Sequence, residues 1–138
     1  MRTSQPSAGV FGGHKILLVD DNEDAVELLA EWFRMRGATV ETALDGPSAL
    51  ETAKRFGPEI ALLDLGLPAM NGYELARRLR AQEEHREMLL IAVTGYGEQS
   101  ARDETTAAGF DDHCVKPLDL GVFELRLRER LAKRRPSA

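Results

Sequence analysis

Cysteine is almost missing from this chain, since Cys114 is the only one among 138 residues. A single thiol excludes a disulfide within the chain and fits a reducing compartment. We expect Cys114 to be a small core residue rather than a reactive thiol. No run is apolar enough to cross a membrane, and residues 1–13 lack the apolar segment of a signal peptide. The sequence therefore predicts a cytoplasmic protein with no membrane partner.

A large excess of charge of one sign is also lacking. The formal net charge is -5 at pH 7, which argues against nucleic acid as the main partner. Basic residues gather between positions 126 and 135, and cations at the C-terminal end of a helix explain them more simply than a nucleic-acid patch. The hydrophobic fraction of 43% supplies one core. We expect one domain at residues 14–134, between a flexible lead at 1–13 and a tail at 135–138.

Short apolar runs alternate five times with segments of helical periodicity. We expect strands at residues 15–19, 38–43, 59–64, 88–93 and 112–115. We expect helices at residues 23–36, between Asp45 and Gly57, at 73–84 and 98–108, and after Asp119, with the two aspartates as N-caps. Short connections between buried strands require right-handed crossovers. The pattern predicts an α/β fold with one doubly wound parallel sheet of five strands and helices on both faces.

Polar side chains stand where four of these strands end. They are Asp20 and Asp21, Asp64, Thr94 and Lys116. Parallel strands place all their C-terminal ends at one edge of the sheet, so these side chains should converge there. Three neighbouring carboxylates repel one another, and a divalent cation would remove that repulsion. A small site of oxygen ligands suits Mg2+. With a carboxylate nucleophile, a metal and a lysine, such a site is suited to phosphoryl transfer.

Several short motifs carry a resemblance to a known family. They are Val19-Asp20-Asp21-Asn22, Leu63-Asp64-Leu65-Gly66-Leu67-Pro68, Asn71-Gly72, Thr94-Gly95 and Val115-Lys116-Pro117. In this order and over residues 15–133, the chain resembles the receiver domain of two-component response regulators, either stand-alone or of the hybrid-kinase type. The resemblance implies a flavodoxin-like sheet with strand order 2-1-3-4-5. It also implies a phosphorelay module that catalyses only its own phosphorylation and slow dephosphorylation.

The resemblance assigns a role to each strand-end residue. Asp64 would accept the phosphoryl group from a phosphohistidine of a sensor kinase or a phosphotransfer helix bundle. Asp21 would bind Mg2+ directly and Asp20 more through water, with Asp64 and the Gly66 carbonyl as further ligands, and Mn2+ can substitute for Mg2+. Lys116 would hold the phosphoryl group, Thr94 would swing toward it, and the Lys116–Pro117 peptide would be cis.

The partner is expected at the first helix and the loop after the last strand. If Val26, Leu29, Ala30 and Phe33 face the sheet, Ala25 and Leu28 form a second apolar stripe near Asp21. Together with Pro117 and Leu118, these two residues would receive the kinase or phosphotransfer helices. Farther along this stripe, we expect Trp32 and Met35 to pack under neighbouring segments. The protein should be a monomer or a weak dimer.

His113 departs from the commonest family pattern, which has Tyr or Phe three residues before the lysine. This change leaves open whether position 113 acts as a switch or is a surface histidine at a strand edge.

Three other functions stay open beside phosphoryl acceptance. The first is a docking domain of the same fold that works without phosphorylation. Such a domain would not need the site residues, so their presence as an intact set speaks against it. A haloacid-dehalogenase-type phosphatase would want an Asp where Gly66 stands, and Asp20-Asp21-Asn22 would repel the phosphate of a flavin.

Overall fold

The computed structural model describes residues 9–95 and 102–133. Its strands are β1 (Lys15–Val19), β2 (Thr39–Ala43), β3 (Ile60–Asp64), β4 (Leu89–Thr94) and β5 (Asp112–Val115). Its helices are α1 (Glu23–Arg34), α2 (Gly46–Phe56), α3 (Gly72–Arg80), the 3-10 turn η2 (Glu83–His85), α4 (Arg102–Ala108) and α5 (Leu120–Lys133). Strand and helix alternate along the chain, as the sequence predicts.

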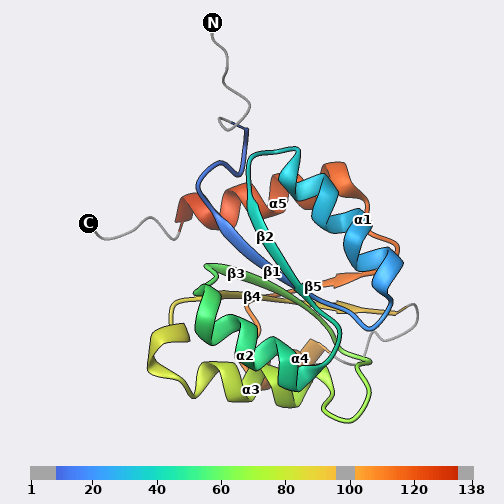
Figure 1. The fold of residues 1–138 in the computed structure, drawn as a ribbon, viewed down its shortest axis with the longest axis vertical. Coiled ribbons are helices and arrows are strands. Elements are labelled where there is room, and N and C mark those ends of the chain that lie inside the picture. Colours follow the sequence, from blue (N-terminus) through green and yellow to red (C-terminus); the bar gives the residue numbers. More distant parts are fainter. Residues whose placement is uncertain (1–8, 96–101, 134–138) are drawn as a thin grey trace, which may run out of the picture.

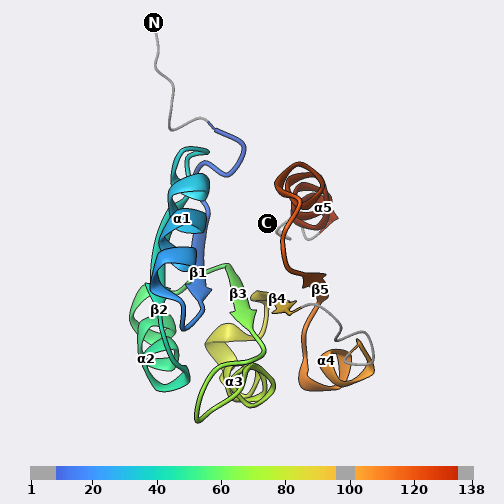
Figure 2. The same ribbon diagram turned by 90° about the vertical axis from the view of Figure 1, so that its right-hand side faces the viewer.

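The five strands form one parallel sheet in the order β2-β1-β3-β4-β5. Helices α1 and α5 cover one face of this sheet, and α2, α3 and α4 cover the other (Figures 1 and 2). The predicted α/β class, strand order and double winding are therefore confirmed. All the strands end at the same edge, which is the edge that carries the polar residues.

Each face of the sheet has its own apolar core, and β3 contributes to both. Ala61 and Leu63 belong to the cluster under α2, α3 and α4, whereas Ile60 and Leu62 belong to the cluster under α1 and α5. All four side chains are at most 2% exposed. A continuous apolar run in a short strand is typical of such two-sided burial. The run ends at Asp64, so this carboxylate is held at the end of a rigid strand.

Polar side chains cap the helices that begin at the functional edge. Asn22 Oδ1 accepts a hydrogen bond from Ala25 N at 3.1 Å at the start of α1. Asp45 and Asp119 each accept from the backbone N three residues downstream, at 2.8 and 3.2 Å, which confirms both as N-caps. Such a bond satisfies one of the unpaired N–H groups at a helix start. The caps keep the first turns of these helices beside the ends of β1, β2 and β5.

The lead predicted for residues 1–13 is too long. Phe11 is fully buried, with its ring centroid 6.2 Å from that of Trp32 and 5.4 Å from that of Phe33. Its backbone N donates to Arg36 O at 2.9 Å. The ordered domain thus includes this segment ahead of β1, because an aromatic ring fills the outer end of the core under α1. Residues 1–8 and 134–138 lie outside the described residues.

Two helices end earlier than expected, and the start of a third lies outside the described residues. The helix expected at residues 23–36 ends at Arg34. The helix expected at 73–84 ends at Arg80, and a separate turn at Glu83–His85 follows, because Gln82 takes an extended backbone at φ -89° and ψ 129°. The helix expected at 98–108 is described from Arg102 onward, and residues 98–101 lie outside the described part. Across residues 9–95 and 102–133, the helices are too short or too polar to span a bilayer.

Candidate functional site

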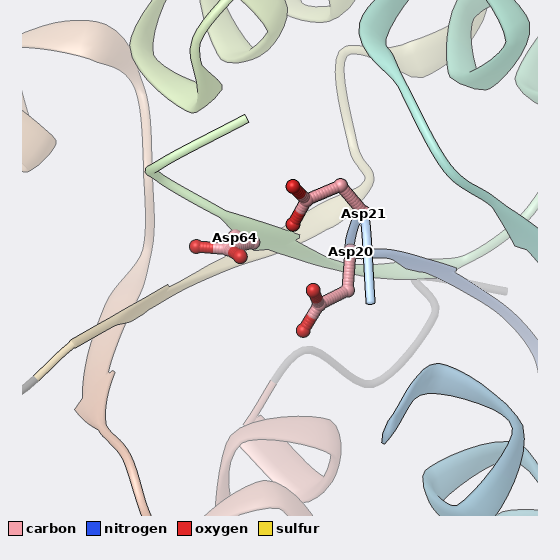
Figure 3. A group of neighbouring side chains, drawn as sticks. All are labelled: Asp20, Asp21 and Asp64. Atoms are coloured by element: carbon pink, nitrogen blue, oxygen red, sulfur yellow. The ribbon is translucent and has the colours of Figure 1, made fainter. Parts of the chain in front are cut away.

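Three carboxylates meet at the C-terminal edge of the sheet (Figure 3). Asp20 and Asp21 directly follow β1, and Asp64 is the last residue of the neighbouring strand β3. Each offers an oxygen atom, and these atoms all lie within 4.8 Å of one another. The side chains of Asp20 and Asp64 are 15% and 13% exposed, whereas Asp21 faces solvent. The cluster is therefore open on the Asp21 side.

Lys116 reaches this cluster from the end of β5. Its Nζ donates to Asp20 Oδ2 at 3.0 Å and to Asp64 Oδ2 at 3.4 Å. Burial alone would lower the pKa of Lys116, but the hydrogen bond to Asp20 and the charges of Asp64 and Asp20 together outweigh it and raise that pKa. The ammonium therefore stays charged. The peptide bond that follows it, Lys116–Pro117, is cis, as the resemblance implies.

Asp64 is the least solvated member of the cluster and carries a perturbed pKa. Burial raises the pKa of its carboxyl, and the neighbouring charge of Asp20 adds to this. The backbone N of Gly66, which donates to Asp64 Oδ1 at 3.0 Å, and the charge of Lys116 oppose the increase. With its groups ionised, the cluster of three carboxylates and one ammonium has a charge of about -2, which a divalent cation would balance.

The donor set fits a hard divalent cation such as Mg2+. Its protein groups are carboxylate oxygens, and their spacing lets several of them approach one ion. Both Asp20 oxygens already have partners, because Asn22 N donates to Oδ1 at 2.9 Å and Lys116 binds Oδ2. Beside Asp64, a Cβ added to Gly66 would lie 3.7 Å from Asp64 Oδ1. The backbone of Gly66 therefore passes close to the cluster.

Thr94 lies at the same edge, on the next strand. Asp64 pairs with Val93 in the β3–β4 register, so Thr94 follows directly. Its side chain is 1% exposed, and its Oγ1 donates to Gly95 O at 3.2 Å. His113 Nε2 lies 3.4 Å from the same Oγ1. All the strand-end residues named from the sequence are thus at one edge, with Asp20, Asp21, Asp64 and Lys116 in a single cluster.

Comparisons with known proteins decide the family. A sequence profile of the response regulator receiver domain matches residues 16–128, which is most of the chain. The chain belongs to the response regulator receiver family. Receiver domains of this family act in two-component signalling, and the strand-end cluster described above lies within the matched region.

Relatives and solved structures agree with this assignment. The phosphate regulon regulator PhoB of Rhizobium meliloti is 34% identical over 122 residues, covering 88% of this chain and 54% of PhoB. The response regulator PleD of Caulobacter vibrioides is 34% identical over 114 residues, covering 83% of this chain and 25% of PleD. The chain thus spans about half or less of these two relatives.

Two solved structures extend the likeness to three dimensions. A response regulator structure from Chloroflexus aurantiacus matches with a TM-score of 0.80 at 29% identity, covering 86% of this chain and 98% of that one. The receiver domain of a sensor histidine kinase from Pseudomonas aeruginosa matches with a TM-score of 0.75 at 33% identity, covering 86% and 96%. That structure holds a magnesium ion in its active site cleft.

An apolar groove opens beside the carboxylate cluster of this receiver. It has a volume of about 600 Å3 and runs between the first turns of α1 and the loop after β5. Ala25 and Leu28 line it from α1, and Pro117 and Leu118 from the loop. Lys116, Asp20 and Asp64 border the groove as well. The four residues expected to receive a partner therefore line one continuous hollow that reaches the site.

The outer stripe of α1 is only partly as expected. Trp32 packs against Phe11, Phe33 and Phe123, which confirms that it lies under neighbouring segments. Met35, expected to pack in the same way, is 75% exposed, because the stripe turns away from these rings at the end of the helix. Leu28 is 74% exposed. Of the stripe, Trp32 is thus half-buried against the core, whereas Leu28 and Met35 face outward.

Two residues that shape the site were given no role from the sequence. Gly72 begins α3, and a Cβ there would lie 2.7 Å from Asp64 O and 2.8 Å from the Cα of Leu65. Only glycine lets the loop after β3 fold back so closely on the strand. His113 was noted for its residue type, but its contact with Thr94 depends on the pairing of β4 with β5. The Asn71-Gly72 pair is a local sequence signal that predicts the turn. No local sequence signal predicts the contact between His113 and Thr94.

Proposed function

We propose that this receiver accepts a phosphoryl group on Asp64 from a phosphohistidine of a sensor kinase or a phosphotransfer helix bundle. The observation that supports this most is the convergence of Asp20, Asp21, Asp64 and Lys116 in one cluster. The cluster combines a carboxylate nucleophile with an ammonium that attracts an anion. Phosphoryl transfer needs this kind of positioning and charge neutralisation more than covalent assistance.

In the proposed step, a carboxylate oxygen of Asp64 attacks the phosphorus atom. A new O–P bond forms, the P–N bond to the donor imidazole breaks, and that nitrogen keeps the electron pair and takes up a proton. The Lys116 ammonium holds a phosphoryl oxygen, and the Thr94 hydroxyl donates to another after turning away from Gly95 O. When bound, Mg2+ supplies positive charge that offsets the three carboxylates and the phosphoryl oxygens.

The proposed Mg2+ ligands differ in how directly they bind. Asp21 and Asp64 would bind the ion through their carboxylates, and Gly66 through its carbonyl oxygen. Asp20 would act more through water, because Asn22 N and Lys116 Nζ already occupy both of its oxygens. Mn2+, which prefers similar oxygen ligands, would substitute for Mg2+.

We further propose that the chain acts on no substrate besides its own Asp64. Water would slowly attack the phosphorus of the acyl phosphate, which returns Asp64 to its free form. The module would act in the cytoplasm as a monomer or weak dimer, without binding nucleic acid itself. Phosphorylation would change its surface and so its binding of partners.

The proposed docking site for the phosphohistidine partner is the groove between α1 and the loop after β5. Its apolar lining includes Ala25, Leu28, Pro117 and Leu118, and it borders Asp64 directly. The donor imidazole must come within bonding distance of Asp64, so the helix that carries it has to lie across this edge of the sheet. An apolar groove of this kind suits an amphipathic helix.

Chemical phosphorylation tests the proposal without the partner. Incubation with Mg2+ and acetyl phosphate should add one phosphoryl group by intact-mass spectrometry, and Asp64→Asn should take up none. The matched control is Asp24→Asn, which removes an exposed carboxylate on α1 and should label like the wild type. Labelling of Asp64→Asn at the wild-type level would show that another residue is the acceptor. Labelling that is unchanged in EDTA would refute the metal role.

A further inference from the structure

A second hollow lies between α2 and α3, on the face of the sheet opposite α1 and α5 (Figure 1). Its volume is about 530 Å3, and no residue of the carboxylate cluster lines it. Helix α2 lines one side with residues three or four apart, namely Pro47, Leu50, Glu51 and Lys54. The end of α3 and the turn η2 line the other side with Arg78, Ala81, Gln82 and His85. This α2–α3 hollow is therefore separate from the groove beside Asp64.

The early end of α3 brings a histidine into the α2–α3 hollow. The backbone is extended at Gln82, and η2 follows with His85 as its last residue. His85 is 4% exposed, although it lines the hollow. Its backbone N donates to Gln82 O at 3.0 Å, and its backbone O accepts from Arg80 Nη1 at 3.4 Å. The imidazole is therefore the polar group that His85 has left to offer to the hollow.

This imidazole has no hydrogen-bond partner within the described part of the protein. Across residues 9–95 and 102–133, no hydrogen bond or ion pair reaches its ring nitrogens. Burial lowers the pKa of His85, and the charge of Glu84 opposes this only in part, so the ring is neutral near pH 7. A neutral imidazole has one N–H donor and one acceptor nitrogen. A polar group with so little access to water gains free energy from a ligand that supplies the missing bond.

The rim of the α2–α3 hollow has an excess of positive charge. Among the described residues that line it, Lys54 and Arg78 are cations and Glu51 is the only carboxylate. Arg78 is bound to Glu74 at 2.8 Å, whereas Lys54 forms no ion pair with any described residue. The Lys54 ammonium is thus the charge that remains available to an anion.

We propose that the α2–α3 hollow binds a small organic carboxylate that has an apolar body. The carboxylate pairs with the Lys54 ammonium and accepts a hydrogen bond from the imidazole N–H of His85. The apolar body covers the side chains that form the rest of the wall, which are Pro47, Leu50 and Ala81. The volume of the hollow lies within the range of small-molecule sites. Because Asp64 is not part of this site, the ligand binds whether or not the receiver is phosphorylated.

Titration with benzoate, a carboxylate on an apolar ring, tests the proposal by NMR of the 15N-labelled chain. The amide signals of Gln82 and His85 should shift saturably, with half-saturation at about 1 mM, the affinity expected of so small a ligand. Benzylamine, which has the same ring and the opposite charge, should shift neither signal. The absence of a saturable shift, or equal binding of benzylamine, would refute the proposal. Shifts at Ala25 and Leu28 instead would place benzoate in the groove beside Asp64 and would refute it as well.

Two substitutions test the two polar contacts of the ligand. Lys54→Gln should raise the half-saturating benzoate concentration about threefold, the effect of an exposed ion pair. His85→Leu, which removes the ring N–H, should raise it about fivefold. The matched control is Arg77→Gln, which removes an exposed cation of α3 outside the lining and should bind benzoate like the wild type. Lys54 is exposed, so its variant remains a valid test if His85→Leu fails to fold. Unchanged affinity in Lys54→Gln, or an equal loss in Arg77→Gln, would overturn the proposal.

Discussion

Leu28→Asp should separate the chemistry of this receiver from the docking of its partner. Leu28 lines the groove beside Asp64, and its side chain is 74% exposed, so the folded chain depends little on it. A partner helix that fills the groove would bury this side chain. The aspartate would then place a charge in an apolar contact, while the carboxylate cluster itself stays unchanged.

The size of the effect follows from the exposed fraction. Complete burial of a leucine side chain contributes about 1.5–3 kcal/mol. With 74% still to be buried, Leu28 offers about 1–2 kcal/mol to the complex, which corresponds to a factor of about 5 to 30 in rate or affinity. Burying the new carboxylate adds a further cost. We therefore expect transfer from the cognate phosphohistidine to slow at least about tenfold.

The assay compares two phosphoryl donors on the same variants. Labelling by acetyl phosphate should be unchanged in Leu28→Asp, because a small donor does not use the groove. The matched control is Met35→Asp, which makes the same charge change at a side chain that is 75% exposed and that directly follows the last residue of α1, away from the groove. Met35→Asp should accept the phosphoryl group from the phosphohistidine at the wild-type rate. If both donors slow together, Leu28 supports the fold or the site rather than docking, and if Met35→Asp slows transfer equally, charge alone explains the effect.

Three further predictions concern stability. Phe11→Ala should lower the free energy of unfolding by about 3–5 kcal/mol, because it empties a fully buried site beside Trp32. Urea unfolding followed by Trp32 fluorescence measures this, and a loss below about 1 kcal/mol would contradict the burial. Helix α4 should exchange its amide hydrogens faster than α1, since Thr105 and Ala108 anchor it with small side chains. Exchange at an equal or slower rate would show that it is not weakly held. Burial lowers the pKa of His85, so the folded chain resists the proton that the unfolded chain takes up below about pH 6.5. Stability should therefore fall as the pH drops through this range, and His85→Asn should flatten the change in the urea midpoint between pH 7.5 and 5.5.

The sheet and its polar edge could be predicted from the sequence, because both depend on sequence patterns that span only a few neighbouring residues. The apolar run that ends at Asp64 is read directly as a strand buried on both faces, and Asp45 and Asp119 stand where caps are needed. Once the strands are parallel, their ends must share one edge. The meeting of Asp20, Asp64 and Lys116 therefore follows from topology, without knowledge of any side-chain contact.

Contacts between distant segments could not be predicted in the same way. Phe11 is surrounded by glycines and small residues and resembles a loop, and only its packing on Trp32 and Phe33 makes it part of the core. Met35 is apolar and lies on the same stripe of α1 as Trp32, yet it remains outside. Both outcomes depend on where other segments of the chain lie. The periodicity of the sequence within α1 does not predict which of its residues those segments cover.

The end of α3 has a similar cause. The Arg80 guanidinium donates to Met88 O at 2.6 Å, to Gly109 O at 2.9 Å and to Asp111 Oδ2 at 2.7 Å. These acceptors belong to segments up to 31 residues away, so the chain must turn soon after Arg80 to bring Met88 beside it. The helical pattern of residues 73–84 does not predict these hydrogen-bond acceptors of Arg80, because they lie in other segments.

Asp64 occupies the boundary between two environments of opposite character, and under the proposed function this arrangement would let transfer and recognition be altered separately. On one side it meets the ionic groups of Asp20, Asp21 and Lys116. On the other side it borders a groove whose lining beyond Asp20, Asp64 and Lys116 is apolar. A small phosphodonor needs only the ionic side, whereas a protein donor must also match the groove. Substitutions in the groove should therefore change which partner phosphorylates the receiver while the carboxylate cluster keeps its intrinsic rate, and substitutions in the cluster should affect every donor alike.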